Sequence, residues 1–299
     1  MKSLSIKHIF SSSTFKHLRF SFSFFLLPVF MFSLSQATII DWGNTILAFL
    51  IIHLLVFPSS NGYNSYQDKD ETSIGGLKHP PKVTKGLFYV TLIFDLLALL
   101  LGVLISIEFS AFLLVFILMS RAYSYRKIRL KKYPIIAFLT VFIFQGGFIY
   151  LTSALAITGQ SVSELLHTGT ILCMLVSSLF MGSMYPLTQV YQHESDKKDG
   201  VISFSYVLGY NGTFIFSGAL FFIATLLMVY YFWFIQKPFG LLLFIAFVIP
   251  MAVQMSKWFK KVRGNVSHAN FENTMSMNLI TSSCMNLYFL ILSLINFLT

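Results

Sequence analysis

Charged side chains are scarce in this chain. Asp, Glu, Lys and Arg make up 11% of its residues, against about a quarter in an ordinary soluble domain. Hydrophobic residues make up 56%, which is more apolar surface than a soluble fold of this length buries in one core. Cysteine is scarce as well. Cys173 and Cys284 lie in apolar stretches without a partner at metal-ligand spacing, so we expect neither a disulfide framework nor a zinc site.

Apolar runs long enough to cross a bilayer, about 20 residues, occur nine times. They lie near residues 20–36, 42–57, 86–106, 109–122, 134–156, 166–186, 213–233, 239–256 and 276–297. We therefore predict an all-α, polytopic membrane protein, a bundle of about nine transmembrane helices. The first run follows basic residues, as in a signal peptide, but no small-residue cleavage site precedes the next run, so we expect a true first span. Residues 1–18 would form a cytoplasmic N-terminal segment, and residues 19–299 one membrane domain.

The basic residues are distributed unevenly over the predicted loops. With the N-terminus in the cytoplasm, 20 of the 21 Lys and Arg residues fall in cytoplasmic segments, and Lys237 falls on the other side. Because Lys and Arg stay on the cytoplasmic side of short loops, this predicts the orientation, and we expect a bacterial inner membrane. Nucleic-acid binding would need a basic face on a soluble domain, so the net charge of +10 does not indicate a nucleic-acid partner.

Two cytoplasmic segments hold six of the eleven acidic residues. One follows the second predicted span and the other follows the sixth. Each contains a Tyr, then an amide, then an Asp four residues after the amide and a further acid three residues later. The matching residues are Tyr63, Asn64, Asp68 and Glu71 in the first cluster, and Tyr191, Gln192, Asp196 and Asp199 in the second.

This spacing predicts a metal site. Positions i, i+4 and i+7 of a helix lie within about 60° of one another, so each cluster would direct one amide oxygen and two carboxylates toward one point. Mg²⁺ takes oxygen ligands and shares carboxylates with substrate phosphates. The expected ligands are Asn64, Asp68, Glu71, Gln192, Asp196 and Asp199. Solvation of the loops, the usual role of charge runs, is the alternative, but two matched clusters on one side favour the metal.

The motifs resemble those of the UbiA-type intramembrane prenyltransferases, over residues 19–299. That family has nine helices, with Asn-x-x-x-Asp-x-x-x-Asp after the second and Asp-x-x-x-Asp after the sixth, and both motifs bind Mg²⁺ and a prenyl diphosphate. Asn64 and Asp68 match the first motif, and Asp196 matches the second. Two positions depart, because Thr72 and Gln192 stand where acids are expected.

We expect other carboxylates to replace the two missing acids. Glu71 or Asp70 would serve in the first cluster, and Asp199 in the second, as the i+7 geometry permits. The resemblance implies that Asp68 and Asp196 are the catalytic residues.

The loop between the fourth and fifth predicted spans resembles the Tyr-Ser-x-x-x-x-Lys-Leu-Lys loop of the chlorophyll-synthase branch of that family. It reads Tyr123-Ser124-Tyr125-Arg126-Lys127-Ile128-Arg129-Leu130-Lys131. Its cations would neutralise a departing diphosphate, or equally would anchor the loop to anionic lipid. The expected diphosphate-binding residues are Lys78, Arg126, Arg129 and Lys131.

The resemblance implies a Mg²⁺-dependent transfer of a prenyl group from its diphosphate to an aromatic or lipid-like acceptor, with the tail among helices open to the bilayer. Two alternatives stay open. Thr72 and Gln192 allow a degenerate member that binds isoprenoid lipid without turnover. A transporter is the other, although transporters usually keep their polar groups near the bilayer midplane. Within the spans, Asp95 either faces an acceptor or is hydrogen-bonded in the bundle, and His53 is expected to be a packed core residue.

Overall fold

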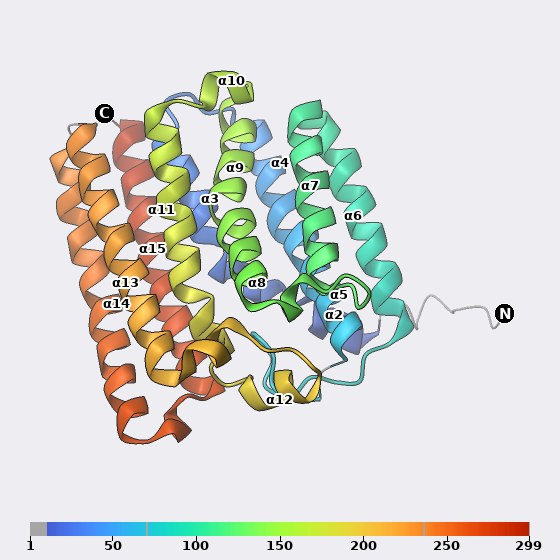
Figure 1. The fold of residues 1–299 in the computed structure, drawn as a ribbon. Coiled ribbons are helices and arrows are strands. Elements are labelled where there is room, and N and C mark those ends of the chain that lie inside the picture. Colours follow the sequence, from blue (N-terminus) through green and yellow to red (C-terminus); the bar gives the residue numbers. More distant parts are fainter. Residues whose placement is uncertain (1–10, 70, 236, 299) are drawn as a thin grey trace.

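The computed structural model describes residues 11–69, 71–235 and 237–298. Within these residues the chain is a helical bundle (Figure 1). Eight helical stretches are long and apolar enough to cross a membrane, and a ninth is a pair of helices, Ser12–Phe25 and Leu27–Gln36, bent by 41°. The predicted all-α bundle of about nine spans is confirmed.

Several spans consist of more than one helical segment. In chain order the first candidate span is the bent pair, α2 (Ser12–Leu18) and η1 (Phe20–Phe25) followed by α3 (Leu27–Gln36). The others are α4 (Trp42–Leu50), η2 (Ile51–Val56) and α5 (Phe57–Asp68); α6 (Lys85–Ile105); α7 (Ile107–Ser124); α8 (Pro134–Val141), η4 (Phe142–Phe148) and α9 (Ile149–Thr158); α11 (Thr168–Met184) with η5 (Pro186–Gln189); α13 (Phe204–Phe234); α14 (Pro238–Gly264); and α15 (Phe271–Leu298). The short elements between spans are η3 (Leu130–Lys132), α10 (Val162–Leu165), α12 (His193–Lys198) and η6 (Val266–His268).

Local chemistry explains the boundary between the third and fourth spans. Ser106 separates α6 from α7, and its hydroxyl accepts a hydrogen bond from the Phe109 backbone N–H at 3.0 Å. A side-chain oxygen at this position satisfies one of the free N–H groups of the first turn. The chain reverses direction at Ser106, and α6 and α7 lie side by side as an antiparallel pair at the right of Figure 1.

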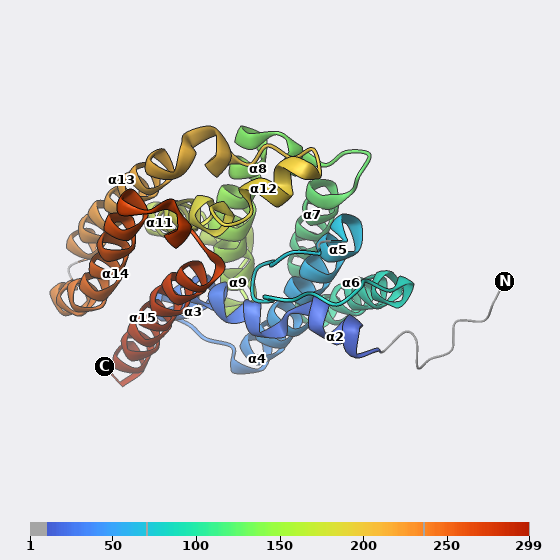
Figure 2. The ribbon, with the colours of Figure 1, turned by 90° about the horizontal axis from the view of Figure 1, so that it is seen from below.

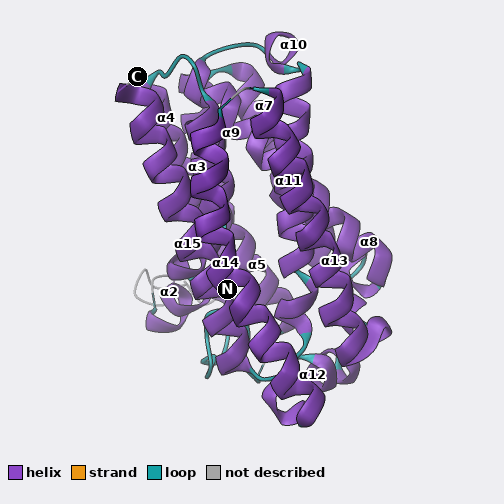
Figure 3. Ribbon diagram, turned by 90° about the vertical axis from the view of Figure 1, so that its left-hand side faces the viewer, coloured by secondary structure: helices purple, strands orange, loops and turns teal. Residues whose placement is uncertain are grey.

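The core lies along the interior of the bundle, where aromatic side chains join helices that are distant in the sequence. Phe32 of α3 stacks on Phe289 of α15 with ring centroids 4.6 Å apart. Many outward side chains are apolar and exposed, such as Leu104 at 70%, as expected where lipid replaces water. Viewed from below and from the side, the spans run roughly parallel around an interior (Figures 2 and 3).

The loops that carry the two acidic clusters meet at one end of the bundle, together with η3 and α12 (Figure 1, bottom). The first cluster lies at the end of α5, because that helix continues past the apolar run to Asp68. This end of the bundle holds the candidate site.

Candidate functional site

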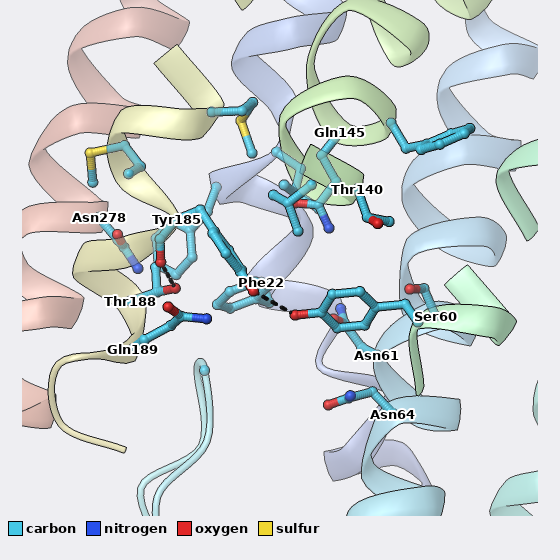
Figure 4. A pocket seen from close by; sticks show the side chains of 18 of the residues that line it. Phe22, Ser60, Asn61, Asn64, Thr140, Gln145, Tyr185, Thr188, Gln189 and Asn278 are labelled. Atoms are coloured by element: carbon cyan, nitrogen blue, oxygen red, sulfur yellow. Dashed lines mark hydrogen bonds between the residues drawn. The ribbon is translucent and has the colours of Figure 1, made fainter. Parts of the chain in front are cut away.

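A cavity of about 300 Å³ extends from the α12 end of the bundle into its interior. Charged and amide side chains from the loops line its mouth, and Phe116, Phe144 and Phe180 line its inner wall. Figure 4 shows the polar side chains that point into it. The cavity is therefore polar at one end and largely apolar beyond.

The first acidic cluster is partly brought to this mouth. Asn64 and Asp68 lie one turn apart on α5 and both line the cavity. The Asn64 amide nitrogen donates to the Ser124 hydroxyl at 3.1 Å. The helical position expected for Glu71 is wrong, because Lys69 adopts a left-handed conformation (φ 56°) and ends α5 at Asp68. Glu71 lies in an exposed bend and does not line the cavity, and Asp70 lies outside the described residues.

The second acidic cluster forms the short helix α12. Gln192 precedes it, and the backbone N–H of Asp196 donates to the Gln192 carbonyl at 2.8 Å. Both side chains line the cavity. The Gln192 amide nitrogen also donates to the Ser73 carbonyl at 3.3 Å, which ties this cluster to the loop after α5. Asp199 ends α12 and does not line the cavity.

His193 attaches α12 to the neighbouring span α13. Its Nε2 lies 2.8 Å from the Ser205 hydroxyl, and its ring packs on Tyr210 with centroids 4.7 Å apart. Burial lowers the pKa of His193 to about 4, although the charge of Glu194 opposes the shift. The ring is therefore neutral near pH 7 and serves to hold α12 in place.

The basic loop joins the two acidic clusters. The Lys131 ammonium pairs with Asp68, and the Arg129 guanidinium contacts both Asp68 and Asp199. Arg126 adds a second contact to Asp199 at 3.3 Å. The Asp68 and Arg129 side chains are only 4% and 10% exposed, and buried charges of this kind need partners. Three of the four predicted cations thus gather at the acidic residues.

Lys78 is not brought to the cavity. Its ammonium pairs with Glu272 at the start of α15, and both side chains are more than half exposed. Lys78 does not line the cavity, so the sequence prediction that it meets a diphosphate there gains no support.

The donor set fits one shared metal ion rather than an all-protein metal cage. Among the described residues, no group of three or more Asp, Glu, His or Cys side chains is arranged for a metal. The mouth nevertheless presents two carboxylates and two amides, from Asp68, Asp196, Asn64 and Gln192. Mg²⁺ is usually held by one or two carboxylates and completes its shell with substrate phosphates and water. The residues therefore fit Mg²⁺ only together with a phosphate ligand.

Two polar residues within the spans are structural. Asp95 pairs with Arg121 and accepts from the Ser59 hydroxyl at 2.6 Å, so the hydrogen-bonded alternative holds for it. His53 is 3% exposed and packs face to face on Phe49 with centroids 5.0 Å apart, as expected of a core residue.

Sequence reasoning missed several polar residues of the cavity. Tyr123 of α7 and Tyr185, which follows α11, meet across it with their hydroxyl oxygens 2.8 Å apart (Figure 4). Gln145 of η4 and Asn278 of α15 also line it. Their signal was an amide or phenol within or beside an apolar span, where polar groups are costly and often functional.

Comparison with known proteins agrees with this architecture. The UbiA prenyltransferase family matches residues 23–280. A search of curated proteins finds no match. Among solved structures, a UbiA homologue from Archaeoglobus fulgidus bound to GPP and Mg²⁺ is 18% identical with a TM-score of 0.68, over 94% of this chain and 99% of that one.

Two further structures share the fold. A UbiA homologue from Aeropyrum pernix K1 is 16% identical with a TM-score of 0.67, over 92% of this chain and 98% of the other. A digeranylgeranylglyceryl phosphate synthase is 17% identical with a TM-score of 0.58, over 94% and 96%. The family match covers most of the chain, and the resemblance seen in the acidic motifs is confirmed. This chain belongs to the UbiA prenyltransferase family.

Proposed function

We propose that this protein is an integral-membrane prenyltransferase that moves a prenyl group from a prenyl diphosphate to a hydrophobic acceptor, with Mg²⁺ as cofactor. The observation that carries the proposal is one cavity with Asp68, Asp196 and Lys131 at its mouth and aromatic rings on its inner wall. A diphosphate suits the mouth, and an isoprenoid tail suits the interior. The A. fulgidus homologue was solved with GPP or DMAPP and Mg²⁺, which supports the same ligand class here.

Transfer would begin with cleavage of the C–O bond between the first prenyl carbon and the diphosphate, whose oxygen keeps the electron pair. Lys131 and Arg129 stabilise the departing charge, Lys131 as a point charge and Arg129 as a planar fork. When bound, Mg²⁺ would neutralise the same leaving group further. Electrostatic stabilisation of this kind is usually the largest contribution to such a rate.

The aromatic wall would then act on the positive charge left on the prenyl group. Phe116, Phe144 and Phe180 line the cavity, and the faces of aromatic rings attract cations. Their apolar surface also keeps water away from the reactive carbon. An electron pair of the acceptor forms the new bond to that carbon, and the acceptor releases a proton, which completes the exchange.

Two carboxylate variants test this proposal. Asp68→Asn and Asp196→Asn should each lower transfer from radiolabelled GPP, in the presence of Mg²⁺ and a lipid extract of the source cells, by about 100-fold or more. Glu194→Gln is the matched control, because Glu194 is exposed on the same helix α12 and does not line the cavity. Near-normal transfer in either Asp variant would remove the basis of the proposal.

A degenerate member that binds isoprenoid lipid is the second candidate. It is favoured by Gln192 in place of an acid and by the exposed position of Glu71. Retention of radiolabelled GPP by the wild-type protein without any transferred product would support this candidate, whereas product formation would exclude it. Uptake of GPP into sealed vesicles would instead favour a transporter.

A further inference from the structure

The cavity contains a second polar region, distant from the charged mouth. Gln145 of η4, Ser177 of α11, and Asn278 and Thr281 of α15 all line it. The first residue of α15 lies beside the mouth, because Phe271 packs on Tyr191 with centroids 5.5 Å apart. At 1.5 Å per residue, Asn278 and Thr281 lie about 10 and about 15 Å further along that helix.

Polar atoms of these four side chains have no hydrogen-bond partner among the residues that the structure describes. The hydroxyls of Ser177 and Thr281 are buried and make no hydrogen bond in the described part of the chain. The amides of Gln145 and Asn278 also make none there, and Asn278 is 5% exposed. Buried polar groups are almost always hydrogen-bonded. Two buried hydroxyls without partners, together with two unbonded amides that line the same cavity, therefore point to a polar occupant.

The backbone at Gln145 is built in an unusual way that brings its side chain into the cavity. Gln145 lies in the π-helical segment η4, and Gly146 inside that segment has φ −96° and ψ −106°. A Cβ at Gly146 would lie 2.4 Å from the Ser178 Cα, so η4 and α11 touch backbone to backbone. Inserted turns of this type are frequent at functional sites. Figure 4 shows the Gln145 amide within the cavity.

The inner region offers no countercharge for an ionised ligand. Among the described residues, the charged side chains that line the cavity are Arg19, Asp68, Lys131 and Asp196. The last three belong to the mouth. Arg19 keeps its charge but lies toward the same end, because its terminal nitrogens donate to the carbonyl of Gly75, in the loop after α5, and to that of Asn61. An isolated charge in an apolar interior is strongly disfavoured. A carboxylate or ammonium group would therefore be a poor ligand there.

A prenyl tail does not explain the inner polar region either. The tail has no hydrogen-bonding atoms, so it would leave all four polar groups unpaired. The aromatic wall suits the tail, whereas the amides and hydroxyls suit a molecule that donates and accepts hydrogen bonds.

We propose that Gln145, Ser177, Asn278 and Thr281 form the acceptor subsite, and that the acceptor has an uncharged hydroxyl or carbonyl head group. This inference rests on the proposed function, because an acceptor must share the cavity with the prenyl group. It assigns the acceptor to neutral phenols, quinols or alcohols and excludes those that carry a carboxylate or an amine.

Three probes with the same hydrophobic tail test the inference: 4-hexylphenol, which is neutral at pH 7.5, 4-hexylbenzoate, which is anionic, and 4-hexylbenzylamine, which is cationic. Each is titrated in tritiated form against the full chain in lipid nanodiscs, with nanodiscs lacking the protein as background. We expect the phenol to bind about tenfold tighter than either charged probe. Equal binding of the three probes, or tighter binding of a charged one, would overturn the proposal.

Leucine variants then assign the binding to the subsite. Gln145→Leu and Asn278→Leu should each weaken phenol binding about tenfold, while radiolabelled GPP binding with Mg²⁺ stays within about twofold. Gln160→Leu removes an amide outside the cavity and should change neither.

Unchanged phenol binding in both cavity variants would refute the subsite. Absence of GPP binding by the wild-type protein, with the probe contrast intact, would instead refute the proposed function and leave these residues as a binding site for a neutral ligand. The contrast among the probes in the wild-type protein does not depend on any variant folding.

Discussion

Asp68 is the most enclosed carboxylate of the candidate site. Its side chain is 4% exposed and is contacted by Lys131 and Arg129. Removing either cation would leave a buried charge with too little compensation, which is usually more costly than the pair itself is favourable. Lys131 also lines the cavity mouth, where we propose that a diphosphate binds, so Lys131 would serve two anions.

Substitution of Lys131 separates the two interpretations of the basic loop. Lys131→Gln should weaken binding of radiolabelled GPP by about tenfold or more, since it removes a charge-assisted contact. Lys132→Gln is the control, because Lys132 is adjacent and exposed. If both variants lose the same small amount of affinity, the loop serves to anchor the protein to anionic lipid.

Asp95 and Arg121 form an ion pair within the spans, with side chains 13% and 17% exposed. Asp95→Ala should lower the free energy of unfolding by about 3–5 kcal/mol, because it strands the guanidinium. The double variant Asp95→Leu/Arg121→Leu should recover at least half of that loss. Thermal unfolding in detergent measures both, and a double variant no more stable than Asp95→Ala would contradict this account.

At the scale of the elements, two spans depart from regular α-helix, and both departures help to shape the site. The π-helical segment η2 comes just before Pro58, which lacks the backbone N–H that an α-helix would use there. The extra residue in a π-helical turn changes the direction of the side chains that follow it on the helix. Gln145 lies in the second such segment, η4, next to the glycine pair Gly146 and Gly147.

A methyl group at Gly146 should disturb this contact. Gly146→Ala would place a Cβ against the Ser178 backbone, which is unable to move aside as a flexible side chain would. We expect a loss of about 1–3 kcal/mol in the free energy of unfolding, typical of overpacking. Gly264→Ala is the control, since no atom lies within 4 Å of its added Cβ. Equal thermal stability of the two variants would count against a close backbone contact.

At the scale of the whole molecule, the basic residues and the candidate site share one end of the bundle. The basic loop, η3 and α12 lie there, whereas Lys237 lies between α13 and α14 at the other end (Figure 1). Because Lys and Arg stay on the cytoplasmic side of a membrane, we propose that this end of the bundle, and the site with it, faces the cytoplasm. A diphosphate head group, which is too polar to cross the bilayer, would then reach the cavity from the cytoplasmic side.

Cysteine labelling tests this orientation. After both native cysteines are replaced by Ala, Lys127→Cys and Lys260→Cys should react with a membrane-impermeant maleimide only in inside-out vesicles. Lys237→Cys should react only in right-side-out vesicles. All three positions are exposed. Labelling of residues 127 and 237 from the same side would contradict the proposed topology.

Much of this architecture could be predicted from the sequence because the signals are local. A continuous run of about 20 apolar residues indicates a helix in lipid, since a helix satisfies every backbone group within the run itself. Asn64 and Asp68 lie four residues apart on α5, so helical spacing places both on the side of the helix that lines the cavity. The position of Glu71 could not be predicted, because α5 ends at Asp68 and the left-handed residue that follows is Lys69, not a Gly that would mark the stop.

The sequence by itself determined the helices, their approximate number and the two amide–carboxylate pairs, because helical periodicity acts over a few residues. Only the tertiary structure decided which charges meet and which polar groups share a cavity. Lys131 reaches Asp68 from 63 residues away, and Gln145 and Asn278 come from helices on separate parts of the chain. Such contacts depend on how the helices pack side by side, and lateral packing leaves no periodic trace in the sequence.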